Sequence, residues 1–237
     1  MDIKIIYSNE ALNNRFKTGW GFSCLINNKI LFDTGENGES LLFNMSLMDI
    51  DINKIEKIVI SHDHWDHTGG MTQILDCRQG LPVFGCTSFS QRFKYNVINH
   101  SGRLFESGEM VEIDKGIIAT GEIGTVHKGM YLAEQSLILK TDNGLSVITG
   151  CAHPGIANIA GLIKEYFPSE DMYLLMGGFH LEDIEQDQID TDVMYIKSLG
   201  FQKIGPAHCT GLEALRSFKD VFGEDFISVS AGQNIIV

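Results

Sequence analysis

Three histidines and two aspartates lie between residues 62 and 67, directly after the apolar run Ile58-Val59-Ile60. In an extended segment His62 and His64 lie on the same side, because strand residues alternate between faces. Asp66 and His67 follow where the chain begins to turn, so this pair can reach a second ion nearby. Imidazole with carboxylate favours zinc, iron or manganese, whereas calcium and magnesium prefer oxygen ligands almost alone. The segment therefore predicts a transition-metal site.

The surrounding motif, Ser61-His62-Asp63-His64-Trp65-Asp66-His67-Thr68-Gly69-Gly70, resembles the signature of the metallo-β-lactamase fold superfamily, a large group of mostly dinuclear metallohydrolases. Residues 30–35, Ile-Leu-Phe-Asp-Thr-Gly, resemble the strand and Asp-Thr-Gly turn before the metal loop of that family. The segments at 149–156, 177–181 and 206–211 resemble one branch, which carries the name 7,8-dihydropterin-6-yl-methyl-4-(β-D-ribofuranosyl)aminobenzene 5′-phosphate synthase. The resemblance covers nearly the whole chain.

The elements that must position these residues alternate between short apolar strands and amphipathic helices. Strands are predicted over residues 3–7, 22–26, 29–32, 57–60, 81–84, 136–141, 145–148, 172–176, 203–204 and 226–229, with hairpin turns at 27–28 and 142–144. Helices are predicted over residues 39–48, 68–76, 155–166, 189–199 and 212–222, and the stretch 88–134 is mixed. The resemblance implies an α/β fold, an αββα sandwich of two mixed sheets flanked by helices, formed by residues 1–237 as one domain.

The two halves of the chain resemble each other faintly. Residues 30–35 resemble 146–151, and the strand that leads to His62 resembles residues 203–208. Two βα halves would place their strand ends along one edge of the sandwich, where α/β folds usually bind ligands. His153 and His208 each follow a predicted strand in such a place. The predicted metal ligands are therefore His62, His64, Asp66, His67, His153 and His208.

The position that bridges the two ions, usually an aspartate in the family, is occupied differently here, because Thr149-Gly150 is followed by Cys151. In one register Cys151 replaces the aspartate, and His127 or Glu134 is the upstream ligand. In the other, His153 is the third ligand of the first ion and a hydroxide forms the bridge. We favour the second register, which leaves Cys151 either as a thiolate ligand or as a small buried residue behind the cleft.

Three further residues complete the predicted site. His180 is expected either to bind metal or to donate a proton, and Asp33 to accept a hydrogen bond from a ligand imidazole. Asp66 and His180 are the predicted catalytic residues, with Cys151, His180 and Asp33 as additional ligands or supporting groups. Trp65 and Phe179 either line the pocket or pack. Five basic residues could contact a phosphate: Arg15, Lys17, Arg92, Lys94 and Lys128.

This set of residues predicts a metal-dependent hydrolase. Two divalent cations, zinc before manganese or iron, would supply a metal-bound hydroxide that attacks a small phosphoester, thioester or lactone, with a phosphoester favoured. If the branch name applies, the same site would instead serve a synthase that joins a dihydropterin to a ribosylaminobenzene phosphate. A non-catalytic metal-dependent sensor and a di-iron redox protein are the remaining alternatives.

Composition limits the partners and the location. A net charge of −13 over 237 residues disfavours nucleic acid, which is bound through Lys and Arg, and a small, phosphorylated substrate stays compatible. No apolar run is long enough to span a membrane, and Met1-Asp2-Ile3-Lys4 lacks the features of a signal peptide, so a cytoplasmic location is expected. The five scattered cysteines indicate reduced thiols; Cys24, Cys77 and Cys86 are expected to be small buried residues.

Overall fold

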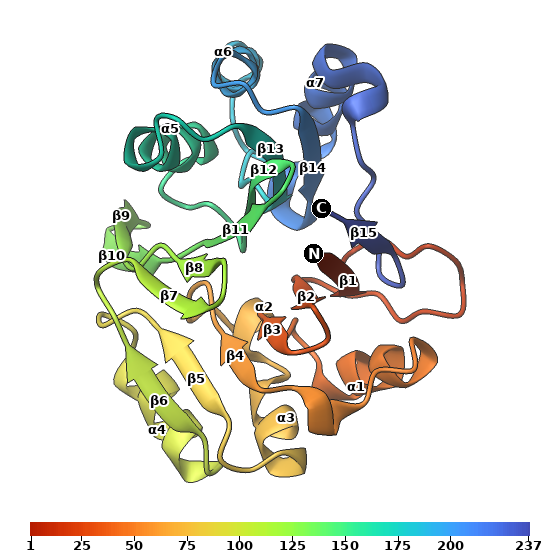
Figure 1. The fold of residues 1–237 in the computed structure, drawn as a ribbon, viewed down its shortest axis with the longest axis vertical. Coiled ribbons are helices and arrows are strands. Elements are labelled where there is room, and N and C mark those ends of the chain that lie inside the picture. Colours follow the sequence, from red (N-terminus) through yellow and green to blue (C-terminus); the bar gives the residue numbers. More distant parts are fainter.

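The computed structural model, which describes residues 1–237, places two mixed β-sheets face to face with helices on their outer surfaces (Figure 1). One sheet has seven strands in the order β15-β1-β2-β3-β4-β5-β6, and the other has six in the order β14-β13-β12-β11-β8-β7. Strands β9 and β10 pair separately as a hairpin. The predicted αββα sandwich is confirmed.

The strands are β1 (Asp2–Tyr7), β2 (Ser23–Ile26), β3 (Ile30–Phe32), β4 (Lys57–Val59), β5 (Pro82–Gly85), β6 (Arg103–Glu106), β7 (Val111–Asp114), β8 (Ile117–Ala119), β9 (Ile123–His127), β10 (Met130–Glu134), β11 (Leu137–Thr141), β12 (Gly144–Thr149), β13 (Met172–Gly178), β14 (Lys203–Ala207) and β15 (Asn234–Ile236). The α-helices are α1 (Gly38–Leu47), α2 (Trp65–Thr68), α3 (Met71–Cys77), α4 (Gln91–Asn99), α5 (Ile156–Tyr166), α6 (Gln186–Ser198) and α7 (Leu212–Phe222). Single 3₁₀ turns span Ile52–Lys54, His208–Thr210 and Gly223–Asp225.

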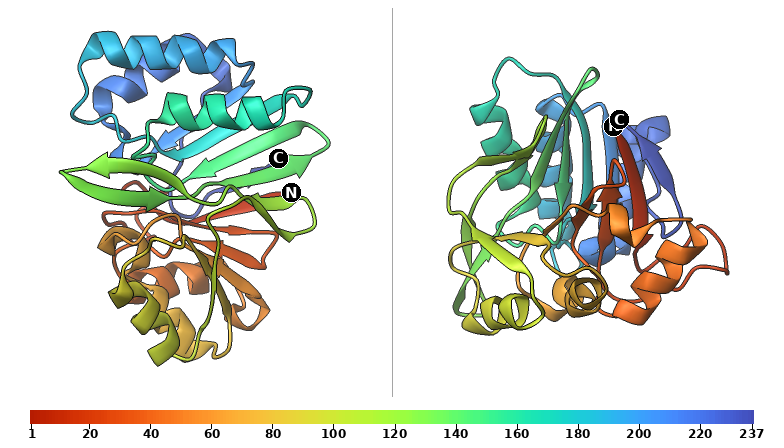
Figure 2. Two further views of the ribbon diagram at one scale, coloured as in Figure 1. Left: turned by 90° about the vertical axis from the view of Figure 1, so that its left-hand side faces the viewer. Right: turned by 60° about the horizontal axis from the view of Figure 1, so that its bottom comes forward.

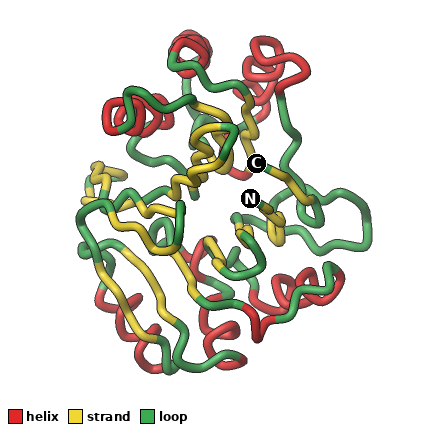
Figure 3. The backbone as a smooth tube through the Cα atoms, in the orientation of Figure 1, coloured by secondary structure: helices red, strands yellow, loops and turns green.

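Three apolar layers hold the sandwich together. Figures 2 and 3 show the arrangement of helices and sheets between which they lie. The central layer, which includes Phe32 and Met176, fills the space between the two sheets. The second lies between the six-stranded sheet and α5, α6 and α7, and includes Phe218. The third lies beneath α1, α3 and α4. Both sheets are therefore covered on both faces, as parallel strands require.

The parallel strands of both sheets end at the side of the molecule that carries the predicted ligands. Strands β3, β4, β5 and β6 run parallel to one another, and so do β12, β13 and β14. Asp33 follows β3 and the His62–His67 segment follows β4, while Cys151, His180 and His208 come after the ends of β12, β13 and β14. The arrangement is the one expected from the two similar halves of the chain.

Two predicted elements are wrong in detail. The predicted strand at 226–229 forms only an isolated bridge between Phe226 and Ile204, because the chain there leaves the edge of one sheet and crosses to the other. The terminal strand is instead β15, which pairs antiparallel with β1. The predicted helix at 68–76 is interrupted at Gly69-Gly70 and divided into α2 and α3. A Cβ atom at Gly69 would lie 2.2 Å from the carbonyl oxygen of Glu36, so the close approach of these segments requires glycine.

Two further findings concern the burial of the cysteines and the lengths of the helices. Cys24 and Cys86 are buried as predicted, whereas Cys77 at the end of α3 is exposed; all five cysteines are free thiols. None of the helices combines the length and the apolar composition needed to cross a bilayer.

Candidate metal centre

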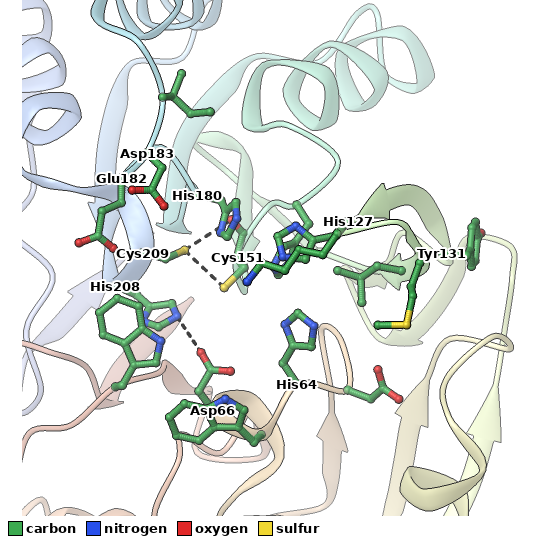
Figure 4. A pocket seen from close by; sticks show the side chains of 18 residues that line it. His64, Asp66, His127, Tyr131, Cys151, His180, Glu182, Asp183, His208 and Cys209 are labelled. Carbon is green, nitrogen blue, oxygen red and sulfur yellow. Dashed lines mark hydrogen bonds and ion pairs between the residues drawn. The ribbon is translucent and has the colours of Figure 1, made fainter.

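A cavity of about 650 Å³ opens at the carboxyl ends of the parallel strands (Figure 4). Its walls come from both sheets and from the β9–β10 hairpin. Among the residues that line it are side chains able to bind a cation: His64, Asp66, His127, Cys151, His153, His180, His208 and Cys209. His62 and His67 are fully buried beneath them. The structure thus gathers all six predicted metal ligands at one place. Cys151 and His180, predicted as additional ligands, and His127, weighed as an alternative, lie there too, and Cys209 is the one of these donors that the predicted ligand set did not include.

The first cluster consists of His62, His64 and His153, one nitrogen of each ring lying within 4.8 Å of the other two. The Nδ1 atom of His62 contacts the hydroxyl of Ser61 at 2.8 Å, but its Nε2 atom is buried and has no hydrogen-bond partner. A buried polar atom without a partner is destabilising by about 1–3 kcal/mol. Three imidazoles that converge in this way can bind a zinc ion, and the ion would then be the missing partner of Nε2 of His62. His153 groups with the first cluster, as in the register that we favoured.

The second cluster consists of Asp66, His67, Cys151 and His208. Oδ2 of Asp66 lies 3.4 Å from Nε2 of His67 and 3.2 Å from Nε2 of His208. Burial opposes ionisation of Asp66, but the close imidazoles of His208 and His67 hold the pKa of this carboxyl well below its usual range. The Sγ atom of Cys151 lies 3.2 Å from Nε2 of His67. Cys151 therefore sits among the candidate ligands, not behind the cleft, although His153 occupies the first cluster.

Asp33 lies beneath His67 and is completely buried. Its Oδ2 atom accepts hydrogen bonds from Nδ1 of His67 and from the hydroxyl of Ser61, both at 2.7 Å, and Oδ1 accepts one from the Ser61 amide at 2.7 Å. Burial alone would lower the pKa of His67, but the adjacent carboxylates, Asp33 first, raise it to about 10. The contact keeps a proton on Nδ1 of His67 and turns Nε2 toward the second cluster. Asp33 thus accepts a hydrogen bond from the imidazole of a candidate ligand, as predicted.

Glu134, at the end of β10, organises the turn that carries Cys151 and His153. Oε1 accepts hydrogen bonds from the amides of Cys151 (3.0 Å) and Ala152 (2.6 Å). Oε2 accepts from the amide and from Nδ1 of His153, both at 2.9 Å. Burial raises the pKa of Glu134, but the hydrogen bonds from His153 and the backbone outweigh it and lower the pKa. The sequence prediction weighed Glu134 only as a metal ligand; in the structure it orients His153.

His180 and His127 extend the set of donors along the cavity. The His180 ring lies 4.3 Å from that of His153, centroid to centroid, and 5.4 Å from that of His127. The Nδ1 atom of His180 is buried without a partner, and Figure 4 shows the ring pointing toward Cys209. Because hydrogen bonding to Cys209 favours the charged imidazole, the pKa of His180 is raised. His180 is thus placed either to bind a cation or to donate a proton.

Several site residues adopt a backbone conformation that only glycine adopts without strain. Asp33, Ala152, His180 and His208 have φ between 51° and 62°. Each follows the end of a strand, and each lies in or beside one of the clusters. Residues held in this region cost roughly 1–3 kcal/mol apiece and persist where the surrounding structure imposes them. Strained residues of this kind cluster at functional sites, so these four support the choice of the cavity as the candidate site.

The rest of the cavity wall is mixed in character. Of the five basic residues predicted to contact a phosphate, only Lys128 lines it, and the acidic side chains of Asp63, Glu182 and Asp183 line it too. Trp65 lines the cavity and is 62% exposed. Phe179 is fully buried and packs edge-on against Phe218.

Comparisons with known proteins agree with this geometry. A family model described as a beta-lactamase superfamily domain matches residues 28–122. The chain is 30% identical to a protein of Methanocaldococcus jannaschii named 7,8-dihydropterin-6-methyl-4-(beta-D-ribofuranosyl)-aminobenzene-5'-phosphate synthase, over 89% of this chain and 85% of that protein.

Solved structures give the same result. The fold is similar to that of Tm1679, described as a metal-dependent hydrolase of the beta-lactamase superfamily, with a TM-score of 0.85 and 29% identity over 100% of this chain and 99% of that one. The short form of human tRNase Z shares the fold with a TM-score of 0.64 and 15% identity, over 100% of this chain and 99% of that one.

Proposed function

Since this chain belongs to the metallo-β-lactamase superfamily, we propose that it is a metal-dependent hydrolase of small ester substrates, most readily phosphoesters. The observation that carries the proposal is the convergence of two clusters of cation ligands on one cavity. Within the first cluster, Nε2 of His62 is buried and has no hydrogen-bond partner. A sensor would need neither the acidic Asp66 beside the open cavity nor a second cluster.

Two groups of residues would hold divalent ions. His62, His64 and His153 would bind one, and Asp66, His67 and His208, with Cys151 beside them, would bind the other. When bound, such ions lower the pKa of a water molecule and polarise the phosphoryl or carbonyl oxygen of a substrate. Zinc suits the mixture of imidazole, carboxylate and thiol, and metal analysis of the purified protein distinguishes it from manganese and iron.

The side chains of the cavity supply the remaining functions. Asp66, held ionised by the adjacent imidazoles of His67 and His208, accepts a hydrogen bond from the attacking water and orients it. His180 faces the same space from the opposite wall and donates a proton to the leaving group. A small phosphoester is compatible with this cavity because bound cations would supply the positive charge that its phosphate needs, and Lys128, the one lysine or arginine in the cavity wall, would add to it.

The substrate is proposed to be a small molecule and not a nucleic acid. The chain has a net charge of −13 and a single lysine in the cavity wall, whereas nucleic-acid backbones are bound through many Lys and Arg side chains. The similarity to human tRNase Z concerns the fold, at 15% identity.

The proposal is tested with protein purified without added metal, then loaded with zinc or manganese. Phosphomonoesters, phosphodiesters, thioesters and lactones are assayed in parallel, and His62→Ala serves as the inactive reference. We expect at least one phosphoester to be hydrolysed by the wild type and not by the variant. Equal inactivity of both proteins on every substrate class would remove the support for a hydrolase.

The name of the archaeal relative favours a second candidate. That relative is 30% identical over 89% of this chain and is named a synthase, so the same cavity could serve the joining of a dihydropterin to a ribosylaminobenzene phosphate. In that reaction the dihydropterin would enter as its 6-methyl diphosphate ester, and pyrophosphate would leave as the new bond to the ribosylaminobenzene phosphate forms. Incubation of the metal-loaded protein with the diphosphate ester and the aminobenzene tests this candidate. Formation of the coupled product with release of pyrophosphate, both lost in His62→Ala, would favour it over the hydrolase.

A further inference from the structure

Two thiols and an imidazole meet at the inner end of the cavity. The Sγ atoms of Cys151 and Cys209 lie 3.3 Å apart, both residues are buried, and neither forms a disulfide. One donor atom each from Cys151, His180 and Cys209 lie within 4.8 Å of one another. These residues follow β12, β13 and β14, three neighbouring strands of one sheet. Figure 4 shows Cys209 directed toward both of the others.

The spacing of these atoms suits a cation. Two sulfurs each about 2.3 Å from a tetrahedral ion lie roughly 3.8 Å apart, so a separation of 3.3 Å needs only a small adjustment. Two thiolates and one imidazole form a donor set typical of soft cations, and three protein ligands leave a fourth position open. All three residues line the cavity, so that open position faces the space in which a substrate would bind.

The structure around the thiols permits this approach. Cys209 reaches Cys151 across Gly178, where a Cβ atom would lie 2.9 Å from Sγ of Cys209 and 2.3 Å from the carbonyl oxygen of Gly150. One nitrogen of the His180 ring, Nδ1, is buried without a hydrogen-bond partner, an independent observation that this imidazole has a donor atom available for a ligand.

We propose that Cys151, His180 and Cys209 form a third cation site, selective for thiophilic ions such as zinc or copper(I), next to the two clusters described above. Cys151 belongs to the second cluster as well, so its thiolate would bridge the third ion and its neighbour. An imidazole that binds a cation through one nitrogen keeps an N–H on the other, so with the third ion bound His180 would donate a hydrogen bond to the substrate and would not transfer a proton. The site goes beyond the proposed hydrolase function and does not depend on turnover.

The test uses metal-free full-length protein that is handled in the absence of oxygen and in the presence of a phosphine reductant. The protein is then titrated with Cd²⁺. Bound cadmium is counted by mass spectrometry, and the sulfur-to-cadmium charge-transfer absorbance in the ultraviolet reports thiolate ligation. The variant is Cys209→Ser. The matched control is Cys86→Ser, which changes a buried thiol that lies in the apolar layer under α3 and α4.

We expect the wild type and Cys86→Ser to bind one cadmium equivalent more than Cys209→Ser. The charge-transfer band should weaken in Cys209→Ser but not vanish, because Cys151 still contacts the second cluster. Equal stoichiometry and an unchanged band in Cys209→Ser would overturn the proposal. If Cys209→Ser does not fold, as judged by circular dichroism, His180→Gln must show the loss of one equivalent, and unchanged stoichiometry there overturns the proposal equally.

A separate variant distinguishes failure of this site from failure of the proposed function. In His62→Ala the first cluster loses a ligand, whereas the thiol site keeps all of its ligands. Cadmium lost in His62→Ala with no dependence on Cys209 would support the first cluster and refute the third site. Loss confined to Cys209→Ser would support the third site and count against the hydrolase.

Discussion

Replacement of Glu134 by Gln should weaken both the fold and the first metal cluster. The carboxylate accepts four hydrogen bonds, from the amides of Cys151, Ala152 and His153 and from Nδ1 of His153. The amide of Gln retains one acceptor oxygen and points an NH₂ group at two of these donors. Each buried donor left without an acceptor costs about 1–3 kcal/mol, so Glu134→Gln should destabilise the protein by about 2–6 kcal/mol.

The same substitution changes the tautomer of His153. With Glu134 the proton resides on Nδ1, so the lone pair of Nε2 faces His62 and His64. If the NH₂ group of Gln faces the ring, Nδ1 becomes an acceptor and the proton moves to Nε2, which then cannot bind a cation. Loss of a hydrogen-bond partner behind a metal ligand typically lowers metal affinity 10- to 100-fold, and we expect about that loss here.

Urea unfolding of the metal-free protein measures the first effect, and zinc competition with a chromophoric chelator measures the second. Glu122→Gln is the matched control, because Glu122 accepts hydrogen bonds from Ser88 and Tyr131 on the exposed hairpin, away from His153. If Glu134→Gln matches the wild type in both unfolding free energy and zinc affinity, Glu134 does not orient the cluster and the reasoning is refuted.

Three further outcomes are expected. Because the pKa of His67 is raised to about 10 in the metal-free protein, zinc binding near neutral pH should release a proton, and zinc affinity should increase as pH rises. Calorimetry in buffers of different ionisation enthalpy measures the proton release. A binding heat that does not depend on the buffer would contradict it. Asp33→Asn removes the charge that raises this pKa, so proton release should fall and zinc affinity should drop about 10- to 100-fold, whereas unchanged proton release would argue against the contact. Gly150→Ala would place a Cβ atom 2.0 Å from Oγ of Ser61 and should destabilise the protein by about 1–3 kcal/mol in urea unfolding. Gly108→Ala, where the nearest atom lies 3.7 Å from the added Cβ, should leave the unfolding free energy unchanged. Equal unfolding free energies of the two variants would contradict the predicted clash at Gly150.

Most of the fold could be predicted from local pattern. Short apolar runs identify β1 to β5 and β11 to β14 within a few residues, because most of these strands are buried on both faces. The terminal strand β15 escaped prediction because Asn234-Ile235-Ile236 is short and is stabilised by pairing with β1 at the other end of the chain. The extended stretch at 226–229 lacks a continuous partner and forms one bridge.

The residues of the candidate site also fall into those that a local sequence pattern predicts and those that depend on distant contacts. The His62–His67 segment is a local signal, and His153 and His208 could be located because each follows an apolar strand. Glu134 could not be placed, because its role depends on contacts with residues 17 to 19 positions along the chain, and nothing in its neighbourhood indicates them. Cys209 and Cys151 are 58 residues apart, and only the packing of β12, β13 and β14 brings their sulfurs together.

Anomalous diffraction at the zinc absorption edge, from crystals of this protein soaked in zinc, tests the central claim most directly. We predict one peak within bonding distance of His62, His64 and His153, and a second within bonding distance of Asp66, His67 and His208. Well-ordered crystals that show no peak at either cluster at saturating zinc would contradict the account.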